Sequence, residues 1–372
     1  MIRYAIVGCG SMGREHIENL HALWGASGNG RIVAVADTDA GSRAQAAAML
    51  EPGTPVLADH RELLDRGGFD AVVIATPNHT HAAVLADVLT TDAHVLVEKP
   101  LVTRVEDGLA LLKQAQSRKG IVWVALEYRY MPPVAELIRM THGGAVGRVH
   151  QVAIREHREP FYQKVGHWNR FSANTGGTLV EKCCHYFNLM EHILGEPAVR
   201  VFASGGQRVN HLDEVYDGRR SDILDSAYAV IEHASGARAM LDLCMFAEGS
   251  IDKEHIVVVG DEGKLESLLP ACTLRYGRRE DWGRRDGWND TSGTGRGVDV
   301  RRIWDRTIRY QGAHFGASYI EHAKFAQAIS AGSPSEITLA EGLRAVAVGV
   351  AAHRSIETGM PVALADVLPA LT

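Results

Sequence analysis

The chain has 372 residues, of which 46% are hydrophobic and 23% charged, and its formal net charge is −6 at pH 7. This composition is typical of a soluble globular protein and excludes a disordered chain, while the length is that of two domains. The acidic balance argues against nucleic acid as a partner, since proteins that bind it carry a basic excess.

No apolar stretch reaches the roughly 18 residues of a membrane span, and the short apolar run at the start does not resemble a signal peptide. The five cysteines are not spaced like zinc ligands, and their odd number does not indicate a disulfide framework. We therefore expect a cytoplasmic protein with no metal site and no membrane partner.

The first 126 residues alternate short apolar runs with helical stretches. Strands that are continuous in apolar residues, as buried parallel strands are, are predicted at 2–7, 32–36, 71–75, 94–97 and 121–125. Helices are predicted between them, at 42–50, 80–89 and 105–117. This alternation predicts an α/β domain over residues 1–126, with the doubly wound parallel sheet of a Rossmann fold.

The pattern changes after residue 127. Strands are predicted at 149–156, 227–233, 237–245, 255–259 and 264–268, and helices at 177–194, 319–330 and 339–357. Strands with few helices between them predict an α+β second domain over residues 127–372, built on a large and mostly antiparallel sheet. The stretch 275–302 is rich in Gly, Arg, Asp and Trp and has little periodicity, so we interpret it as a surface excursion, either a lid or an oligomer contact.

A glycine-rich turn follows the first predicted strand and precedes a helical run. Three glycines serve separate purposes in such a turn: a tight bend, a close approach of backbone to a pyrophosphate, and close packing of helix on strand. The phosphates then lie at the helix N-terminus, where free N–H groups favour negative charge. The predicted cofactor contacts in this turn are Gly8, Gly10, Ser11, Met12 and Gly13.

An acidic residue, Asp37, follows the second predicted strand. A carboxylate at this point can accept hydrogen bonds from both ribose hydroxyls and would repel a 2′-phosphate. The sequence therefore predicts NAD as the cofactor in preference to NADP.

Two more turns follow the third and fourth of these predicted strands, at the sheet edge where ligands of open α/β sheets bind. One contains Thr76, Pro77, Asn78 and His81, and the other is Glu98-Lys99-Pro100. A lysine there can hold a substrate hydroxyl and stabilise a developing alkoxide, although an isolated lysine is more often a solvated surface residue.

Together these motifs resemble the Gfo/Idh/MocA family of oxidoreductases, which includes glucose–fructose oxidoreductase and inositol 2-dehydrogenase. The resemblance extends over essentially the whole chain, through Tyr128-Arg129-Tyr130 to Gly359-Met360-Pro361-Val362. It implies that the loop from Thr76 to His81 contacts the nicotinamide end of NAD, and that Glu98 and Lys99 lie at the cofactor.

The family usually carries D-x-x-x-H on a helix of the second domain, and the matching residues here are Glu181 and His185. Their i,i+4 spacing places both on one helix face. The resemblance implies that His185 is the general base and that Lys99 binds the same hydroxyl oxygen. Glu in place of Asp puts in doubt which hydroxyls it binds. Tyr128 and Glu181 are further acid or base candidates.

Candidate substrate contacts precede and follow this helix. They combine cations, which can hold an anionic group, with aromatic rings, which can stack on a sugar, and they are Arg158, Lys164, His167, Trp168, Arg170, Lys182 and His314. We hypothesise that Lys164, His167, Arg170 and Lys182 form a cradle for a carboxylate, sulfonate or phosphate of an anionic sugar. The alternative is a solvated loop with ordinary surface charge.

Three functions are compatible with these residues. The first is a dehydrogenase that moves a hydride between a hydroxyl of a sugar or polyol and NAD. The second is a redox-neutral glycosidase, known within the family, which oxidises a ring hydroxyl transiently, eliminates the aglycone, adds water and returns the hydride, for example on a sulfoquinovoside. The third is a non-enzymatic NAD sensor or scaffold. The resemblance also implies a homo-oligomer, dimer or tetramer, formed through the open face of the second sheet.

Overall fold

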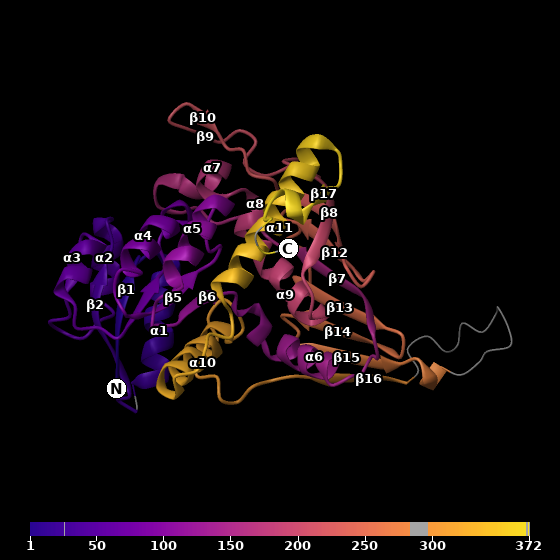
Figure 1. Cartoon of the computed structure of the whole chain (residues 1–372), viewed down its shortest axis with the longest axis horizontal. Helices are drawn as coiled ribbons and strands as arrows, with labels where there is room; N and C mark the ends of the chain where they lie inside the picture. The colour runs from indigo at the N-terminus through magenta and orange to yellow at the C-terminus, as the bar shows by residue number, and fades with distance from the viewer. Residues whose placement is uncertain (26, 283–296, 370, 372) are drawn as a thin grey trace.

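The computed structural model describes residues 1–25, 27–282, 297–369 and 371 (Figure 1). Its N-terminal part contains six parallel strands in the order β3-β2-β1-β4-β5-β6. The strands are β1 (Ile2–Val7), β2 (Gly30–Ala36), β3 (Val56–Leu57), β4 (Ala71–Ile74), β5 (His94–Glu98) and β6 (Val122–Ala125). This confirms the predicted Rossmann-type sheet and adds the short strand β3.

Five helices connect these strands: α1 (Ser11–Trp24), α2 (Ala40–Ala47), α3 (His60–Arg66), α4 (His81–Val88) and α5 (Val105–Ala115). The strand order reverses between β1 and β4, so the loops after β1 and β4 diverge there. Such a switch point opens a crevice at the carboxyl ends of the strands. The glycine-rich turn, the 76–81 loop and the E-K-P turn all lie at this edge.

The second sheet has nine strands in the order β16-β15-β14-β13-β7-β12-β11-β8-β17. It is antiparallel except at the central pair β7–β12, which is parallel. The strands are β7 (Val149–His157), β8 (Ala198–Gly206), β11 (Ser226–His233), β12 (Arg238–Cys244), β13 (Glu254–Gly260), β14 (Gly263–Leu269), β15 (Thr273–Arg278), β16 (Val298–Arg302) and β17 (Val362–Ala363). A separate two-stranded hairpin consists of β9 (Val215–Tyr216) and β10 (Arg219–Arg220).

Longer helices lie between the two sheets, where α9 (Cys184–Leu194) and α11 (Leu339–Thr358) separate the Rossmann sheet from the nine-stranded one (Figure 1). The others in this part are α6 (Pro132–His142), α10 (Ala317–Ala331) and the single turns α7 (Ser172–Thr175) and α8 (Thr178–Glu181). The 3-10 turns are η1 (Asn78–Thr80), η2 (Glu127–Tyr130), η3 (Val165–Arg170), η4 (Glu280–Trp282) and η5 (Leu364–Asp366).

Two predicted segments differ from the structure. The predicted helix 177–194 is broken at Lys182 and Cys183 into α8 and α9. Both ends of the predicted excursion 275–302 are strands, since β15 and β16 pair with each other at the edge of the sheet. The central part of that stretch, 283–296, lies outside the described residues.

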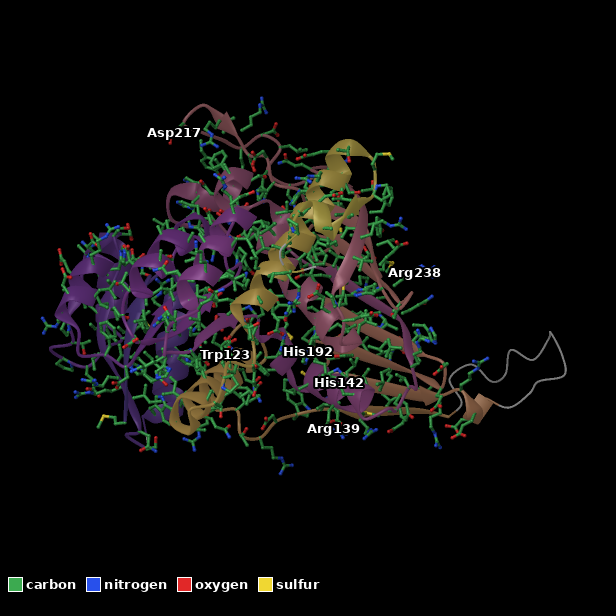
Figure 2. All side chains as sticks on the ribbon, viewed as in Figure 1. Trp123, Arg139, His142, His192, Asp217 and Arg238 are labelled. Atoms are coloured by element: carbon green, nitrogen blue, oxygen red, sulfur yellow. The ribbon has the colours of Figure 1, made fainter. Side chains whose placement is uncertain are left out.

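The C-terminal helices pack on the Rossmann domain as well as on their own sheet. Helix α10 lies against α1, and the backbone N–H of Val124 in β6 donates to the carbonyl of Ile337 at 3.1 Å. Trp123, labelled in Figure 2, is fully buried and donates its indole N–H to Glu321 of α10 at 3.2 Å. The two parts of the chain therefore share one interface. None of the described helices has the length and apolar character needed to cross a membrane.

Candidate active site

The glycine-rich turn has the packing that the sequence predicts for it. At Gly8, where φ is +94°, an added Cβ would lie 2.4 Å from the carbonyl oxygen of Ala75, and at Gly13 it would lie 1.9 Å from that of Gly8. At Gly10 it would meet nothing within 4 Å. Among the described residues no side chain caps the start of α1, so its N–H groups face this open space. The turn therefore fits a pyrophosphate.

Asp37 lies directly beside this turn. Its carboxylate accepts from the backbone N–H of Cys9 at 2.6 Å and from that of Asp39 at 2.7 Å, so its orientation is set by two backbone donors. A carboxylate has about four acceptor positions, which leaves room for ribose hydroxyls. The half-buried carboxylate of Asp37 thus lies beside the glycine-rich turn, where the sequence predicts the ribose of NAD.

The loop after β4 is held to the E-K-P turn by His81. This residue is fully buried, and its ring nitrogens lie 2.8 Å from the carbonyl oxygen of Pro100 and 2.9 Å from that of Thr76. Its side chain therefore has no free nitrogen for a cofactor, so His81 positions the two loops instead of making the predicted contact. The buried amide nitrogen of Asn78 has no partner among the described residues and stays a candidate cofactor contact.

Lys99 extends from the end of β5 toward the second domain. Its ammonium donates to the carbonyl oxygen of Glu181 at 3.3 Å. Burial by itself lowers the pKa of Lys99, but nearby acidic groups, Cys184 and Glu98 foremost, outweigh it and raise that pKa. Lys99 therefore carries its charge into a largely buried site, where a cation has most effect on an oxygen that becomes negative.

His185 lies in the first turn of α9 and is only 2% exposed. Its ring stacks on the ring of Tyr128, with centroids 3.9 Å apart and planes 9° apart. Burial, with the positive charges of Lys99 and Lys182, keeps the pKa of His185 well below its ordinary value. The imidazole is therefore neutral at physiological pH, as a proton acceptor must be.

Glu181 does not pair with His185, although the sequence places both on one helix face. The helix breaks between them, and its remaining turn α8 ends at Glu181. Oxygen Oε2 of Glu181 is buried without a hydrogen-bond partner among the described residues, and burial raises the pKa of this carboxyl to about 7. Lys99 lies beside it and lowers that pKa only in part.

Lys182 occupies the break between α8 and α9. It is buried, donates to the hydroxyl of Tyr128 at 2.6 Å and pairs with Glu156 at 2.9 Å. Arg158 lies 3.6 Å from the same carboxylate and also bonds to Glu159. These contacts neutralise both cations within the protein.

The four members of the predicted anion cradle have different partners within the protein. Lys164 donates to the hydroxyl of Ser11 in the glycine-rich turn at 2.9 Å, and Arg170 pairs with Glu214 at 2.8 Å. His167 stacks on Tyr216 with centroids 4.0 Å apart. Lys182 pairs with Glu156, as described above. The four side chains predicted to form the cradle therefore contact four different partners, each distant in sequence.

Two further predicted contacts lie near the loops that follow the parallel strands. The ring of Trp168 lies 6.3 Å from that of His79 in the loop after β4. His314 reaches Glu15 at 3.5 Å and Glu127 at 3.6 Å, and its ring lies 5.8 Å from that of Tyr128. Both side chains thus lie near the switch point.

Several groups of this site are absent from the sequence prediction. Glu127 lies two residues after the end of β6, and the rule that ligands bind at the carboxyl ends of parallel strands could have found it. His16 contacts Glu98 at 3.1 Å and His322 of α10 at 2.8 Å, so the E-K-P glutamate is engaged within the protein. No local signal marks His16, since its partners come from distant segments.

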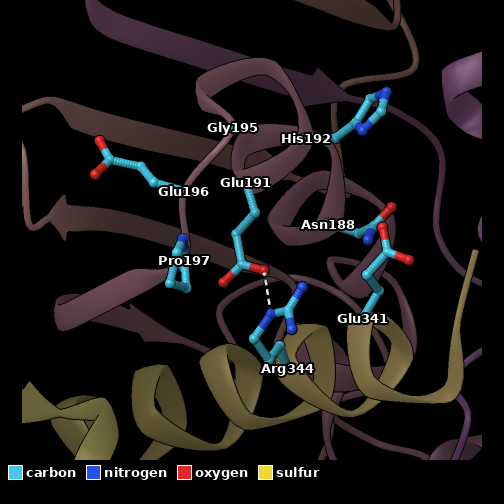
Figure 3. A pocket seen from close by; sticks show the side chains of 8 residues that line it. All are labelled: Asn188, Glu191, His192, Gly195, Glu196, Pro197, Glu341 and Arg344. Atoms are coloured by element: carbon cyan, nitrogen blue, oxygen red, sulfur yellow. Dashed lines mark hydrogen bonds and ion pairs between the residues drawn. The ribbon is translucent and has the colours of Figure 1, made fainter. Parts of the chain in front are cut away.

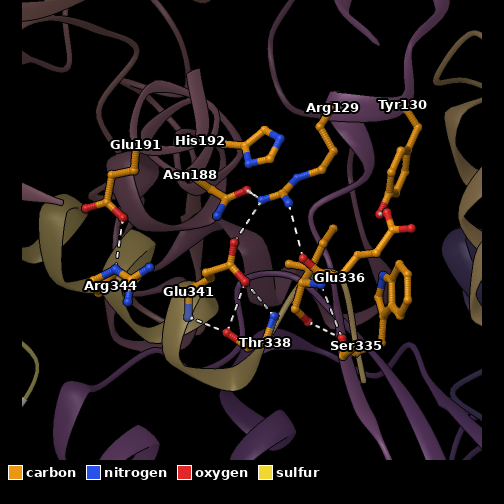
Figure 4. A network of polar contacts seen from close by, with 12 residues as sticks. Arg129, Tyr130, Asn188, Glu191, His192, Ser335, Glu336, Thr338, Glu341 and Arg344 are labelled. Carbon is orange, nitrogen blue, oxygen red and sulfur yellow. Dashed lines mark hydrogen bonds and ion pairs between the residues drawn. The ribbon is translucent and has the colours of Figure 1, made fainter. Parts of the chain in front are cut away.

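A cavity of about 210 Å³ lies apart from this cleft, between the end of α9 and the start of α11 (Figure 3). Two of its three carboxylates form ion pairs: Glu191 with Arg344 at 3.0 Å and Glu341 with Arg129 at 3.3 Å (Figure 4). Glu341 also completes a capping box with Thr338 at the start of α11. These contacts tie α11 to α9, so we assign them a structural role.

Comparison with known proteins agrees with this arrangement over nearly the whole chain. Residues 2–126 match the family model of the NAD-binding Rossmann fold of the GFO_IDH_MocA oxidoreductases, and residues 139–364 match that of their C-terminal alpha/beta domain.

Among curated relatives, myo-inositol 2-dehydrogenase of Thermotoga maritima is 23% identical over 99% of this chain and 100% of its own length. The NAD(+)-dependent scyllo-inositol 2-dehydrogenase of Bacillus subtilis is 26% identical over 100% and 98%. A solved structure of levoglucosan dehydrogenase in complex with NADH and levoglucosan has a TM-score of 0.82 at 20% identity, over 98% of this chain and 99% of that one. The two family matches cover both sheets and the glycine-rich turn, and the chain therefore belongs to the Gfo/Idh/MocA family of NAD-binding oxidoreductases.

Proposed function

We propose that this protein is an NAD-dependent dehydrogenase that oxidises a hydroxyl of a neutral sugar or polyol. The observation that carries the proposal is a charged Lys99 at the carboxyl edge of the Rossmann sheet, close enough to the buried, neutral His185 for its charge to lower the pKa of that imidazole. The relatives named above, which are dehydrogenases of inositols and of levoglucosan, support the substrate class.

The two residues divide the work at the hydroxyl. His185 takes the hydroxyl proton, and Lys99 binds the same oxygen and stabilises its negative charge as the proton leaves. The bound cofactor supplies the hydride acceptor. Burial of His185 limits the access of water to the base, and the partly buried surroundings strengthen the charge interaction of Lys99 with the substrate.

We propose a neutral substrate because the cations of the second domain are already engaged. Arg170, Lys182 and Arg158 pair with carboxylates of the protein. An anionic sugar would have to displace one of these buried pairs, and breaking a buried pair is costly. The polar acceptors that stay open, above all Oε2 of Glu181, suit hydroxyl groups better.

The test is to incubate the protein with NAD and matched neutral and anionic sugars, polyols and their glycosides, following NADH absorbance and aglycone release together. A net dehydrogenase accumulates NADH with no bond cleavage, and inositols and neutral pyranoses should be the best substrates. NAD-dependent aglycone release without NADH would establish the redox-neutral glycosidase instead. Preference for a carboxylated or sulfonated sugar would contradict the neutral substrate.

Lys164 provides a separate test, because its ammonium bonds to Ser11 beside the open N-terminus of α1. We propose that it binds a phosphate of NAD and not the substrate. Loss of a charge-assisted hydrogen bond should raise the Kd of NAD roughly tenfold in Lys164→Met, with the substrate KM nearly unchanged at saturating NAD. Lys253→Met, which removes a surface lysine paired with Glu159, is the control. A higher substrate KM with an unchanged NAD Kd would return Lys164 to the substrate side.

A further inference from the structure

The general base has an unexpected neighbour. Nitrogen Nδ1 of His185 and oxygen Oε2 of Glu127 are both buried and both lack a hydrogen-bond partner among the described residues, and they lie 3.9 Å apart. A buried polar atom without a partner costs about 1–3 kcal/mol. A movement of about one ångström would satisfy both atoms with one hydrogen bond, and such catalytic contacts are often long before the substrate binds.

The second oxygen of Glu127 has its own partner. Oxygen Oε1 lies 3.6 Å from Nδ1 of His314, and the same nitrogen lies 3.5 Å from Oε1 of Glu15 in α1. The order of contacts is therefore His185, Glu127, His314 and Glu15, with each side chain from a different segment. Glu15 is the last group in this order, and its side chain is 12% exposed, compared with 19% for His314.

We propose that Glu127 is the carboxylate that positions His185 for proton abstraction, and that His314, held between Glu127 and Glu15, keeps Glu127 ionised. The inference rests on the proposed function for its kinetic part. An ionised Glu127 accepts the Nδ1 proton of His185 and leaves Nε2 free for the substrate. The hydroxyl proton passes to Nε2 as hydride leaves the carbon for the cofactor, and the O–H electron pair forms the carbonyl. Glu127 then balances the charge of the imidazolium.

The surrounding charges make Glu127 sensitive to His314. Burial raises the pKa of Glu127 and the carboxylate of Glu98 raises it further, whereas His314 and Lys99 lower it. Glu321 of α10 also interacts with this group, and burial, with the carboxylates of Glu127 and Glu98, raises the pKa of that carboxyl well above its ordinary value.

The carboxylates around His314 in turn favour its charged form. Burial by itself lowers the pKa of His314 and Lys182 also lowers it, but the carboxylates of Glu15 and Glu127 outweigh them and raise it. His314 is therefore the nearest charge that favours an ionised Glu127. Below the pKa of Glu127 a protonated carboxyl would donate to Nδ1, which leaves the proton of His185 on Nε2 and disables the base.

The kinetic test compares pH profiles of kcat/KM for the full chain. Glu127→Gln should lower the plateau about 100-fold, as expected for loss of an acid–base partner, and Glu127→Asp should restore part of it. His314→Gln should move the acid limb to higher pH by about one unit at nearly the same plateau, because Glu127 loses its stabilising cation. Glu321→Gln replaces a buried carboxyl whose pKa is raised well above its ordinary value, and it should behave as the wild type. A lower plateau with an unmoved limb in His314→Gln would overturn the inference.

A second measurement does not need turnover. The ¹⁵N shifts of labelled histidine, assigned by the signal missing in His185→Asn, report which ring nitrogen carries the proton. The expected result is a proton on Nδ1 in the wild type and a shift of the tautomer toward Nε2 in Glu127→Gln. A proton on Nε2 in the wild type, or a tautomer unaffected by Glu127→Gln, would overturn the inference even if a polyol is oxidised. If the tautomer responds but no sugar or polyol is oxidised, the proposed function fails and the role of Glu127 stands.

Discussion

Burial determines the protonation states of the residues around the reacting hydroxyl. Burial and the positive charges of Lys99 and Lys182 lower the pKa of His185 well below its ordinary value. Burial raises the pKa of Glu181 to about 7, although Lys99 opposes that shift. Near pH 7 the imidazole of His185 is therefore neutral, and about half of the Glu181 carboxyls are protonated. Lys99 keeps its charge because acidic groups surround it.

The roles of Lys99 and His185 predict a specific kinetic pattern. Lys99→Met and His185→Asn should each lower kcat by about 10²- to 10⁴-fold, the usual contribution of acid–base catalysis, while the Kd of NAD changes little for His185→Asn. Steady-state kinetics and NAD titration measure both effects. His157→Asn, which removes a histidine paired with Asp242 on the second sheet, should leave both unchanged. Full activity in His185→Asn would disprove the assignment of the base.

At the scale of elements, the glycine-rich turn before α1 has two roles: Gly13 allows the helix to pack closely on the turn, and Gly10 leaves space for the cofactor. Gly13→Ala would place a methyl group 1.9 Å from the carbonyl oxygen of Gly8, so α1 would have to move, at a cost of about 1–3 kcal/mol in the free energy of unfolding. Gly10→Ala meets only open space, so it should retain stability and weaken NAD binding instead. Thermal unfolding and NAD titration of both variants separate the two roles. Equal stability of Gly13→Ala and wild type would contradict this account.

At the scale of the whole molecule, the face of the nine-stranded sheet away from the helices exposes apolar side chains. Phe202, Val230 and Met240 are neighbours across β8, β11 and β12, with 46%, 40% and 39% of their surface exposed. Opposite sides of the same strands, such as Val201 and Ile231, are buried in the core. An apolar patch on one face of a sheet is typical of a subunit interface.

We predict that this face joins copies of the chain, as a dimer or tetramer. Val230→Glu and Met240→Glu together should place like charges in the interface and convert the oligomer to monomer, because charge repulsion and desolvation oppose association. Light scattering coupled to gel filtration measures the mass. Ile251→Glu changes an apolar residue that is 87% exposed in a loop and should not alter it. A wild-type chain of monomeric mass would refute the prediction.

The sequence by itself determined the Rossmann domain, the NAD turn and the family, because each depends on local spacing. Runs of apolar residues follow the sheet strands, and the three glycines and Asp37 lie at fixed distances along the chain. It also places Lys99 at the carboxyl edge of the Rossmann sheet, since the ends of the parallel strands meet at a single edge. The family resemblance, and not the spacing, supplied the role of His185.

Only the tertiary structure decided which charged groups meet. Lys164, Arg170 and Lys182 are close in sequence, yet their partners Ser11, Glu214 and Glu156 come from other elements. Likewise Glu181 and His185 have helical spacing, but the helix is interrupted at Lys182, whose ammonium pairs with Glu156. Glu127, and not Glu181, is the carboxylate that faces His185. A buried charge is stable only beside its partner, and contacts between distant segments form through packing, which residue spacing does not encode.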